Sequence, residues 1–76
     1  MCLAVPGKVE KLNSSKNEAT ISYFDGSERT ASTIALVPKT GDYVLVQAGL
    51  VIQVVPEAEA LESIEAWKLL QQTETH

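Results

Sequence analysis

The sequence has 76 residues, and its six basic and ten acidic side chains give a formal net charge of −4 at pH 7. The length suits one small domain, and a content of 45% hydrophobic residues is typical of a folded chain rather than a disordered one. The single cysteine excludes an internal disulfide, and scattered basic residues in an acidic chain argue against a nucleic-acid-binding protein.

Membrane insertion and secretion also find little support in the sequence. The longest nearly apolar run covers residues 43–55, which is shorter than the roughly 20 residues that a membrane-spanning helix needs. No positively charged segment followed by an apolar run marks a secretory signal. We therefore expect a cytoplasmic protein that has no membrane partner and whose thiol stays reduced.

Short strands separated by polar turns are predicted for most of the chain. Alternating polar and apolar residues, β-branched residues and turn clusters are typical of such segments. The last two segments are the most apolar and are expected to form the core. The predicted strands cover residues 8–12, 18–24, 27–33, 43–48 and 50–55.

Three sites that contain glycine predict how the chain turns. Pro6 and Gly7 fit the two central positions of a type II turn. Asp25 followed by Gly26 is a strong signal for a β-hairpin. Gly49 divides the two most apolar segments, so we expect it to mark a bulge or a barrel corner.

A helix is predicted over residues 56–72, because Pro56 suits a first helical turn and good helix formers follow it. Glutamates near its start favour the positive end of the helix dipole. One apolar stripe is expected to pack on the strands, and residues 73–76 are expected to form a frayed tail. The stripe consists of Ala60, Leu61, Ile64, Trp67 and Leu70.

Five short strands with little room for crossover connections predict a mainly β fold. We expect a small antiparallel barrel or a curled sheet with a C-terminal helix, and a closed barrel would protect the strand edges. Residues 1–76 then form a single domain. Its parts are an N-terminal arm over residues 1–7, the β-barrel over 8–55, the C-terminal helix over 56–72 and the tail over 73–76.

Ordinary catalysis finds no support in the sequence. The only histidine is His76, the last residue, so a nucleophile would lack an oriented base. Trp67 is expected in the core, and no glycine-rich phosphate loop is present. We therefore expect a protein that is not an enzyme and has no catalytic residues. The glutamates on the helix, Glu59, Glu62 and Glu65, are expected to form a solvated face.

Cys2 is the residue with the clearest chemical potential. One interpretation is a free cysteine near a loose terminus without any role. The other uses its thiolate, which is a nucleophile and a soft metal ligand. Removal of Met1 would leave an ammonium group beside the thiol and favour the thiolate. The arm would then reach from its hinge at Pro6 and Gly7 into the cleft of a partner.

The segments "MCLAVPGKV" and "GDYVLVQAGLVIQVVPEAEALESIEAW" resemble the HypC/HupF family of hydrogenase assembly chaperones. The cysteine, proline and glycine stand in the order of that family at the start of the chain. Residues 13–39 match mainly in length and in their hairpin pattern. The resemblance implies a small five-stranded OB-like β-barrel with a C-terminal α-helix.

The resemblance also implies a role in the maturation of [NiFe]-hydrogenases. Family members work with a HypD-like iron–sulfur scaffold protein and escort an iron that carries cyanide and carbon monoxide, as Fe(CN)2CO, to the hydrogenase large-subunit precursor. On this chain Cys2 would bind the iron transiently, in a site shared with the partner. The expected partner-binding residues are Cys2, Leu3, Ala4, Val5, Pro6, Gly7 and Gln47.

One position departs from the family pattern. Many members have histidine where this chain has Gln47, and an aromatic residue where it has Leu50. An amide cannot supply an imidazole ligand, so any iron would need further ligands from the partner. Two alternatives remain. One is a docking adaptor that does not itself bind iron, and the other is a single-strand nucleic-acid binder, which the acidic charge and few aromatic residues disfavour.

Overall fold

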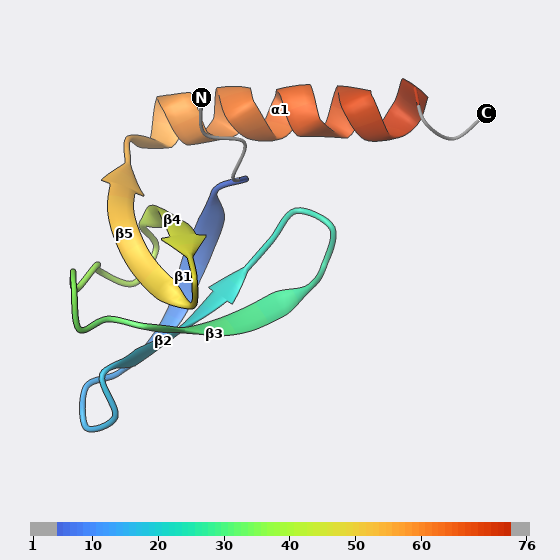
Figure 1. Cartoon of the computed structure of the whole chain (residues 1–76). Coiled ribbons are helices and arrows are strands. Elements are labelled where there is room, and N and C mark those ends of the chain that lie inside the picture. The colour runs from blue at the N-terminus through green and yellow to red at the C-terminus, as the bar shows by residue number, and fades with distance from the viewer. Residues whose placement is uncertain (1–4, 74–76) are drawn as a thin grey trace.

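The computed structural model describes residues 5–73, and Figure 1 shows its course. It contains five strands followed by one helix, so the predicted mainly β fold is confirmed. Each strand begins and ends within two residues of its predicted bounds. The elements are β1 (Gly7–Asn13), β2 (Glu18–Ser22), β3 (Glu28–Ser32), β4 (Tyr43–Gln47), β5 (Leu50–Val55) and α1 (Glu57–Thr73).

The strands form a closed barrel in the order β1-β2-β3-β5-β4. All neighbours are antiparallel except β3 and β5, which run parallel. β1 and β4 pair through Gly7↔Val44 and Lys8↔Tyr43. β3 and β5 meet only at the pair Ser32↔Leu50. This architecture is the expected OB-like barrel with a helix after the last strand.

Every strand contributes to the core of the barrel. Inward positions alternate with exposed ones, as a half-buried strand requires. The core side chains are aliphatic and small, which suits the narrow interior of a five-stranded barrel. They are Val9, Ala19, Ile21, Ala31, Val44 and Val51, each at most 2% exposed.

The expectation for Gly49 is wrong, because this residue lies in a hairpin turn rather than in a bulge. β4 ends at Gln47 and β5 begins at Leu50, so Ala48 and Gly49 form a two-residue connection. Both have positive φ, 53° and 77°. Two positive φ values are the mark of the type I′ turn, whose twist matches that of the adjoining strands.

The expected type II turn at Pro6 and Gly7 is also wrong. Gly7 begins β1 and does not have the positive φ that such a turn needs. The glycine is required for packing instead. A β-carbon at this position would overlap Cγ2 of Ile21 and come within 2.8 Å of Cε1 of Tyr23.

α1 lies across one end of the barrel and its last turns extend past the strands, which gives the molecule an extent of 45 × 21 × 21 Å (Figure 1). Ala60 and Ile64 are buried and Trp67 is half-buried, as expected for the apolar stripe. Leu61 and Leu70 are 47% and 53% exposed, so the stripe is only partly covered. Within the described residues, no helix has both the length and the apolar character to cross a membrane.

The close packing at Gly7 generates a first prediction. Gly7→Ala should lower the free energy of unfolding by about 1–3 kcal/mol, since the added methyl group must displace Ile21 or Tyr23. Urea denaturation measures the change. Lys8→Ala, at the next and exposed position of β1, serves as the control and should change stability by less than about 0.5 kcal/mol. Equal stability of Gly7→Ala and the wild-type protein would contradict this packing argument.

The turn between β4 and β5 generates a second prediction. Ala48 holds a left-handed conformation that a non-glycine residue adopts at a cost, whereas asparagine is favoured before glycine in type I′ turns. Ala48→Asn should therefore raise the free energy of unfolding by about 0.5–1 kcal/mol. Ala35→Asn, in the exposed connection before β4, should leave stability unchanged. A loss of stability in Ala48→Asn would show that the turn type is assigned wrongly.

Candidate functional site

A groove lies between β3 and the two turns that connect β2 to β3 and β4 to β5. We call it the hairpin groove, and its volume is about 360 Å³. It combines apolar and aromatic side chains with one cation and one carboxylate. Its lining residues are Val5, Tyr23, Phe24, Asp25, Ser27, Arg29, Thr30, Val46, Ala48 and Gly49.

The groove exists because β3 and β5 separate almost as soon as they meet. At their contact the backbone N–H of Ser32 donates to the carbonyl oxygen of Gly49, with an N···O distance of 2.7 Å. Ser32↔Leu50 is the only residue pair between the two strands. Toward its N-terminal end β3 therefore pairs only with β2, and its other edge is bounded by the β4–β5 turn instead.

The turn between β2 and β3 forms one end of the groove, and it confirms the hairpin predicted from Asp25 and Gly26. The N–H of Tyr23 donates to the carbonyl of Ser27 at 2.9 Å, and that of Gly26 donates to the carbonyl of Tyr23 at 3.0 Å. Gly26 has a φ of 89°. These contacts define a three-residue loop in which glycine takes the left-handed position.

Hydrogen bonds within this turn fix the orientation of Asp25. Its Oδ1 accepts one bond from the Ser27 hydroxyl at 2.7 Å and another from the Ser27 N–H at 2.9 Å. These bonds to Ser27, with a smaller contribution from the charge of Arg29, hold the pKa of the Asp25 carboxyl below its usual value. The carboxylate is therefore ionised and engaged with its own turn.

Tyr23 links the groove to the barrel, because it packs partly against the core. Burial raises the pKa of its phenol above the usual value, and the positive charge of Arg29 opposes this change. The phenol thus stays neutral at physiological pH. It gives the groove an aromatic wall with a polar tip.

The predicted partner-binding residues fall into three groups. Cys2, Leu3 and Ala4 lie outside the described residues. Val5 lines the hairpin groove, whereas Pro6 and Gly7 are buried at the start of β1. Gln47 is exposed at the end of β4 and is not a lining residue, but both of its neighbours, Val46 and Ala48, line the groove. The structure therefore brings the base of the arm close to the segment that contains Gln47.

Sequence reasoning missed the residues from β2, β3 and their turn. Tyr23 and Phe24 were expected only as strand residues, and Arg29 was given no role. The Asp25-Gly26 signal located the hairpin but not the direction in which its tip points. A basic residue beside a predicted turn was the one available hint.

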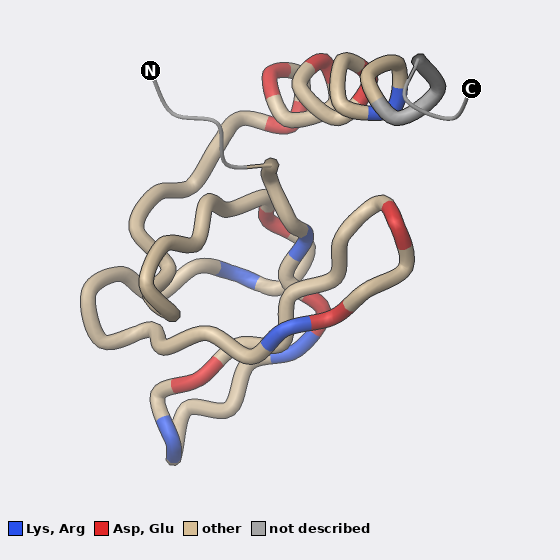
Figure 2. Tube along the Cα trace, turned by 45° about the vertical axis from the view of Figure 1, so that its right-hand side comes forward, with Lys and Arg blue, Asp and Glu red and all other residues tan. Residues whose placement is uncertain are grey.

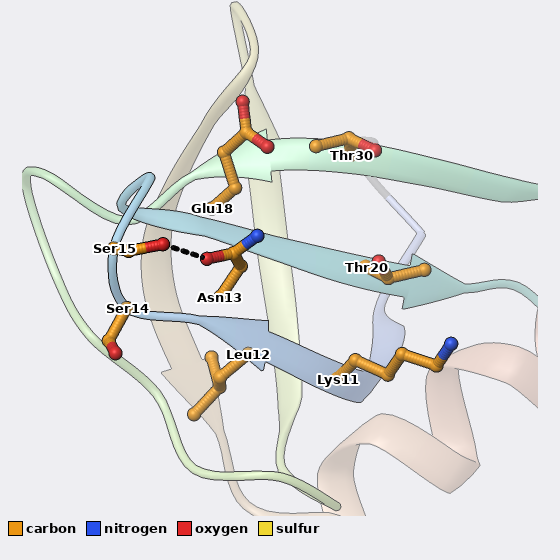
Figure 3. Close-up of a pocket in the computed structure, with 8 residues that line it drawn as sticks. All are labelled: Lys11, Leu12, Asn13, Ser14, Ser15, Glu18, Thr20 and Thr30. Atoms are coloured by element: carbon orange, nitrogen blue, oxygen red, sulfur yellow. Dashed lines mark hydrogen bonds between the residues drawn. The ribbon is translucent and has the colours of Figure 1, made fainter.

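Two other grooves border the barrel. One, of about 230 Å³, lies between α1 and the strands and includes Pro6, Tyr43 and Leu61. The other, of about 400 Å³, lies on the outer face of β1, β2 and β3. Figure 3 shows its polar side chains, with the Ser15 hydroxyl donating to Asn13 Oδ1 at 2.8 Å. The groove beside α1 meets the arm at Pro6, whereas the groove on the outer face includes no residue of the arm.

Charges are distributed unevenly between the helix and the barrel. Acidic residues concentrate in the first half of α1, beginning with Glu57 and Glu59, whereas the strands and turns carry both signs (Figure 2). Among residues 5–73, no three or more His, Cys, Asp and Glu side chains are grouped so that they could hold a metal ion.

The Ser27–Asp25 contact generates a third prediction. Ser27→Ala should raise the pKa of Asp25 toward its ordinary value, which an NMR titration of the carboxyl carbon measures. Because the folded-state pKa is the lower one, this interaction favours folding above the unfolded-state pKa. Its contribution is lost as the pH falls through the folded-state pKa. Ser15→Ala, in the other hairpin, should leave the Asp25 titration unchanged, and an unmoved Asp25 titration in Ser27→Ala would refute the assignment.

Comparison with known proteins places the chain in a family. Residues 1–67 match the model of the HupF/HypC family. The hydrogenase maturation factor HypC of Synechocystis sp. is 39% identical over 69 residues, which cover 84% of this chain and 90% of that protein. The hydrogenase maturation factor HypC of Azotobacter chroococcum mcd 1 is 32% identical over 65 residues, covering 84% of this chain and 75% of that protein. The chain therefore belongs to the HupF/HypC family.

Proposed function

We propose that the protein is a non-catalytic chaperone of [NiFe]-hydrogenase maturation. It helps to carry the Fe(CN)2CO unit from a scaffold complex to the hydrogenase large-subunit precursor, with Cys2 as its own ligand to the iron. Family membership supports the proposal, since both relatives described above are named hydrogenase maturation factors. Its partners would be a HypD-like iron–sulfur scaffold protein and the precursor, in the cytoplasm, where the thiol stays reduced.

The observation that carries this proposal is the position of Val5 in the hairpin groove. Cys2 precedes Val5 by three residues. A fully extended chain spans about 3.3–3.6 Å per residue, so only a short length of chain separates the thiol from a residue that lines the groove. The groove offers apolar and aromatic walls to a small complex delivered there, and its volume lies within the range of about 300–1,000 Å³ typical of ligand sites.

The chemistry of the arm suits this cargo. A thiolate is a soft ligand and binds iron that already carries strong-field cyanide and carbon monoxide ligands. One thiolate occupies one coordination position, so the scaffold must hold the iron until transfer. Cys2 would then act while bound to a partner, and the iron is cargo rather than a resident cofactor.

The second candidate function is a docking adaptor that brings scaffold and precursor together without binding iron. Gln47 favours it, since the family resemblance implies histidine at this position in many members and an amide cannot supply an imidazole ligand. Both functions use the same surface, and they differ in whether the iron ligands depend on Cys2.

Replacing Cys2 tests the two functions directly. The protein, with a C-terminal tag that leaves its N-terminus free, is purified anaerobically together with its partners. In Cys2→Ala and Cys2→Ser we expect loss of the infrared bands of cyanide and carbon monoxide from material bound to this chain, because the thiolate ligand is gone. Cellular hydrogenase maturation should fall in parallel. Ser63→Ala, on the exposed face of α1, is the control and should behave as wild type.

The outcomes separate the candidates. Partners that co-purify with bands independent of Cys2, or with no bands at all, would identify the docking adaptor. Full maturation by Cys2→Ala in cells without the native protein would overturn the role of the thiolate.

A further inference from the structure

The hairpin groove carries one positive charge, and it comes from Arg29 of β3. The positive charge of Arg29 acts on both Tyr23 and Asp25, because its contribution lowers the pKa of each side chain. Among the described residues, no side chain forms a hydrogen bond or an ion pair with the guanidinium of Arg29. Its fork of N–H donors is therefore available to a ligand.

The carboxylate that lines the groove is oriented by hydrogen bonds within its own turn. Asp25 also lines the groove, but its Oδ1 is held by both the hydroxyl and the N–H of Ser27. The turn thus holds Oδ1 of its own acidic residue, and among the described residues no hydrogen bond joins this carboxylate to the guanidinium of Arg29. A cation arranged in this way favours a negatively charged acceptor.

A second donor comes from the unpaired edge of β3. The N–H of Ser32 points toward β5, since it donates to the carbonyl of Gly49. Along a strand, every second backbone N–H points to the same edge. The N–H of Thr30 therefore lies on the same edge of β3 as the N–H of Ser32. No strand pairs with β3 there, because Ser32↔Leu50 is its only pair with β5. The Thr30 N–H therefore faces the groove that this residue lines.

The side chain of Thr30 has a different position. Side chains alternate along a strand, so those of Arg29 and Thr30 point to opposite faces. Thr30 also lines the groove on the outer face of the barrel, together with Thr20 and Glu18 (Figure 3). The hairpin groove therefore meets Thr30 mainly at its backbone, which supports the amide N–H as the donor.

We propose that the hairpin groove binds the cyanide ligands of the iron cargo, with the Arg29 guanidinium and the Thr30 N–H as donors to the cyanide nitrogens. This inference rests on the proposed function, because Cys2 must bring the iron to the groove. Metal-bound cyanide is a linear, negatively charged acceptor, whereas carbon monoxide accepts hydrogen bonds poorly. The apolar side of the groove, formed by Val5, Val46 and Phe24, suits the carbon monoxide ligand.

The experiment compares Arg29→Gln and Arg29→Lys with the wild-type protein in the anaerobically purified complex with the scaffold. Lys11→Gln is the matched control, since it removes the same charge from the outer face of the barrel. Thermal unfolding checks that all variants fold. Three quantities are then measured: the amount of scaffold bound, the iron retained per complex, and the infrared frequencies of the cyanide and carbon monoxide ligands.

Arg29→Gln should bind the scaffold as the wild-type protein does but retain iron roughly tenfold less tightly, as expected for the loss of a charged hydrogen bond. The cyanide bands of the remaining cargo should move to lower wavenumber, because a hydrogen bond at nitrogen stiffens the C–N bond. Arg29→Lys keeps the charge without the planar fork and should give an intermediate result. Lys11→Gln should match the wild type.

Each contrary result has a distinct meaning. If the wild-type complex holds no cyanide bands that depend on Cys2, the proposed function is wrong and this inference is wrong with it. If those bands are present but Arg29→Gln leaves both the bands and the iron content unchanged, only this inference is overturned. If Arg29→Gln weakens scaffold binding itself, Arg29 contacts the partner protein and not the cargo.

Discussion

The single residue pair between β3 and β5 determines the shape of the hairpin groove. One pair, Ser32↔Leu50, closes the barrel, and the Ser32 N–H to Gly49 oxygen bond of 2.7 Å marks the seam. A longer ladder would bring the β4–β5 turn against β3 and fill the groove. If β3 and β5 did not pair at all, both strands would have an exposed edge that can pair with another chain. The barrel is thus closed at this seam and leaves the hairpin groove open beside it.

Close packing at the other side of the barrel connects this groove to the N-terminus. Gly7 begins β1 directly against Ile21 and Tyr23, so β1 can approach β2 more closely than a side chain would permit. Tyr23 in turn lines the groove that Val5 reaches. The start of β1 is therefore held by backbone packing, and the preceding Val5 lines the groove. Pro6 and Gly7 are therefore buried at the start of β1 and do not form a turn.

Much of the fold could be predicted from the sequence because its signals are local. Alternation in residues 18–22, the Asp25-Gly26 hairpin and the change to helix formers after Pro56 each reflect short-range preferences. The errors at Gly7 and Gly49 have a common cause, since glycine permits a turn, a bulge or a close approach with equal ease. Only the three-dimensional neighbours decide between these roles. Among the residues that line the hairpin groove, the sequence prediction named Val5, through the family motif, while Cys2 lies outside the described residues. Arg29 and Thr30 gain their place from strand pairing across the barrel. The partial burial of α1 could not be predicted either. Helical periodicity identifies the apolar face of a helix, but not how much of that face the barrel covers.

A seam held by one residue pair also has a dynamic consequence. Local opening of a protein costs less free energy where few contacts must break, so β3 and β5 will part far more often than the whole barrel unfolds. β4 and β5 are paired along their length and joined by a two-residue turn, so this hairpin can move as a unit when β3 and β5 separate. The width of the groove is then adjustable while the β1–β2–β3 meander stays intact. The rate at which the groove opens is then set by this seam, where β3 and β5 share a single residue pair.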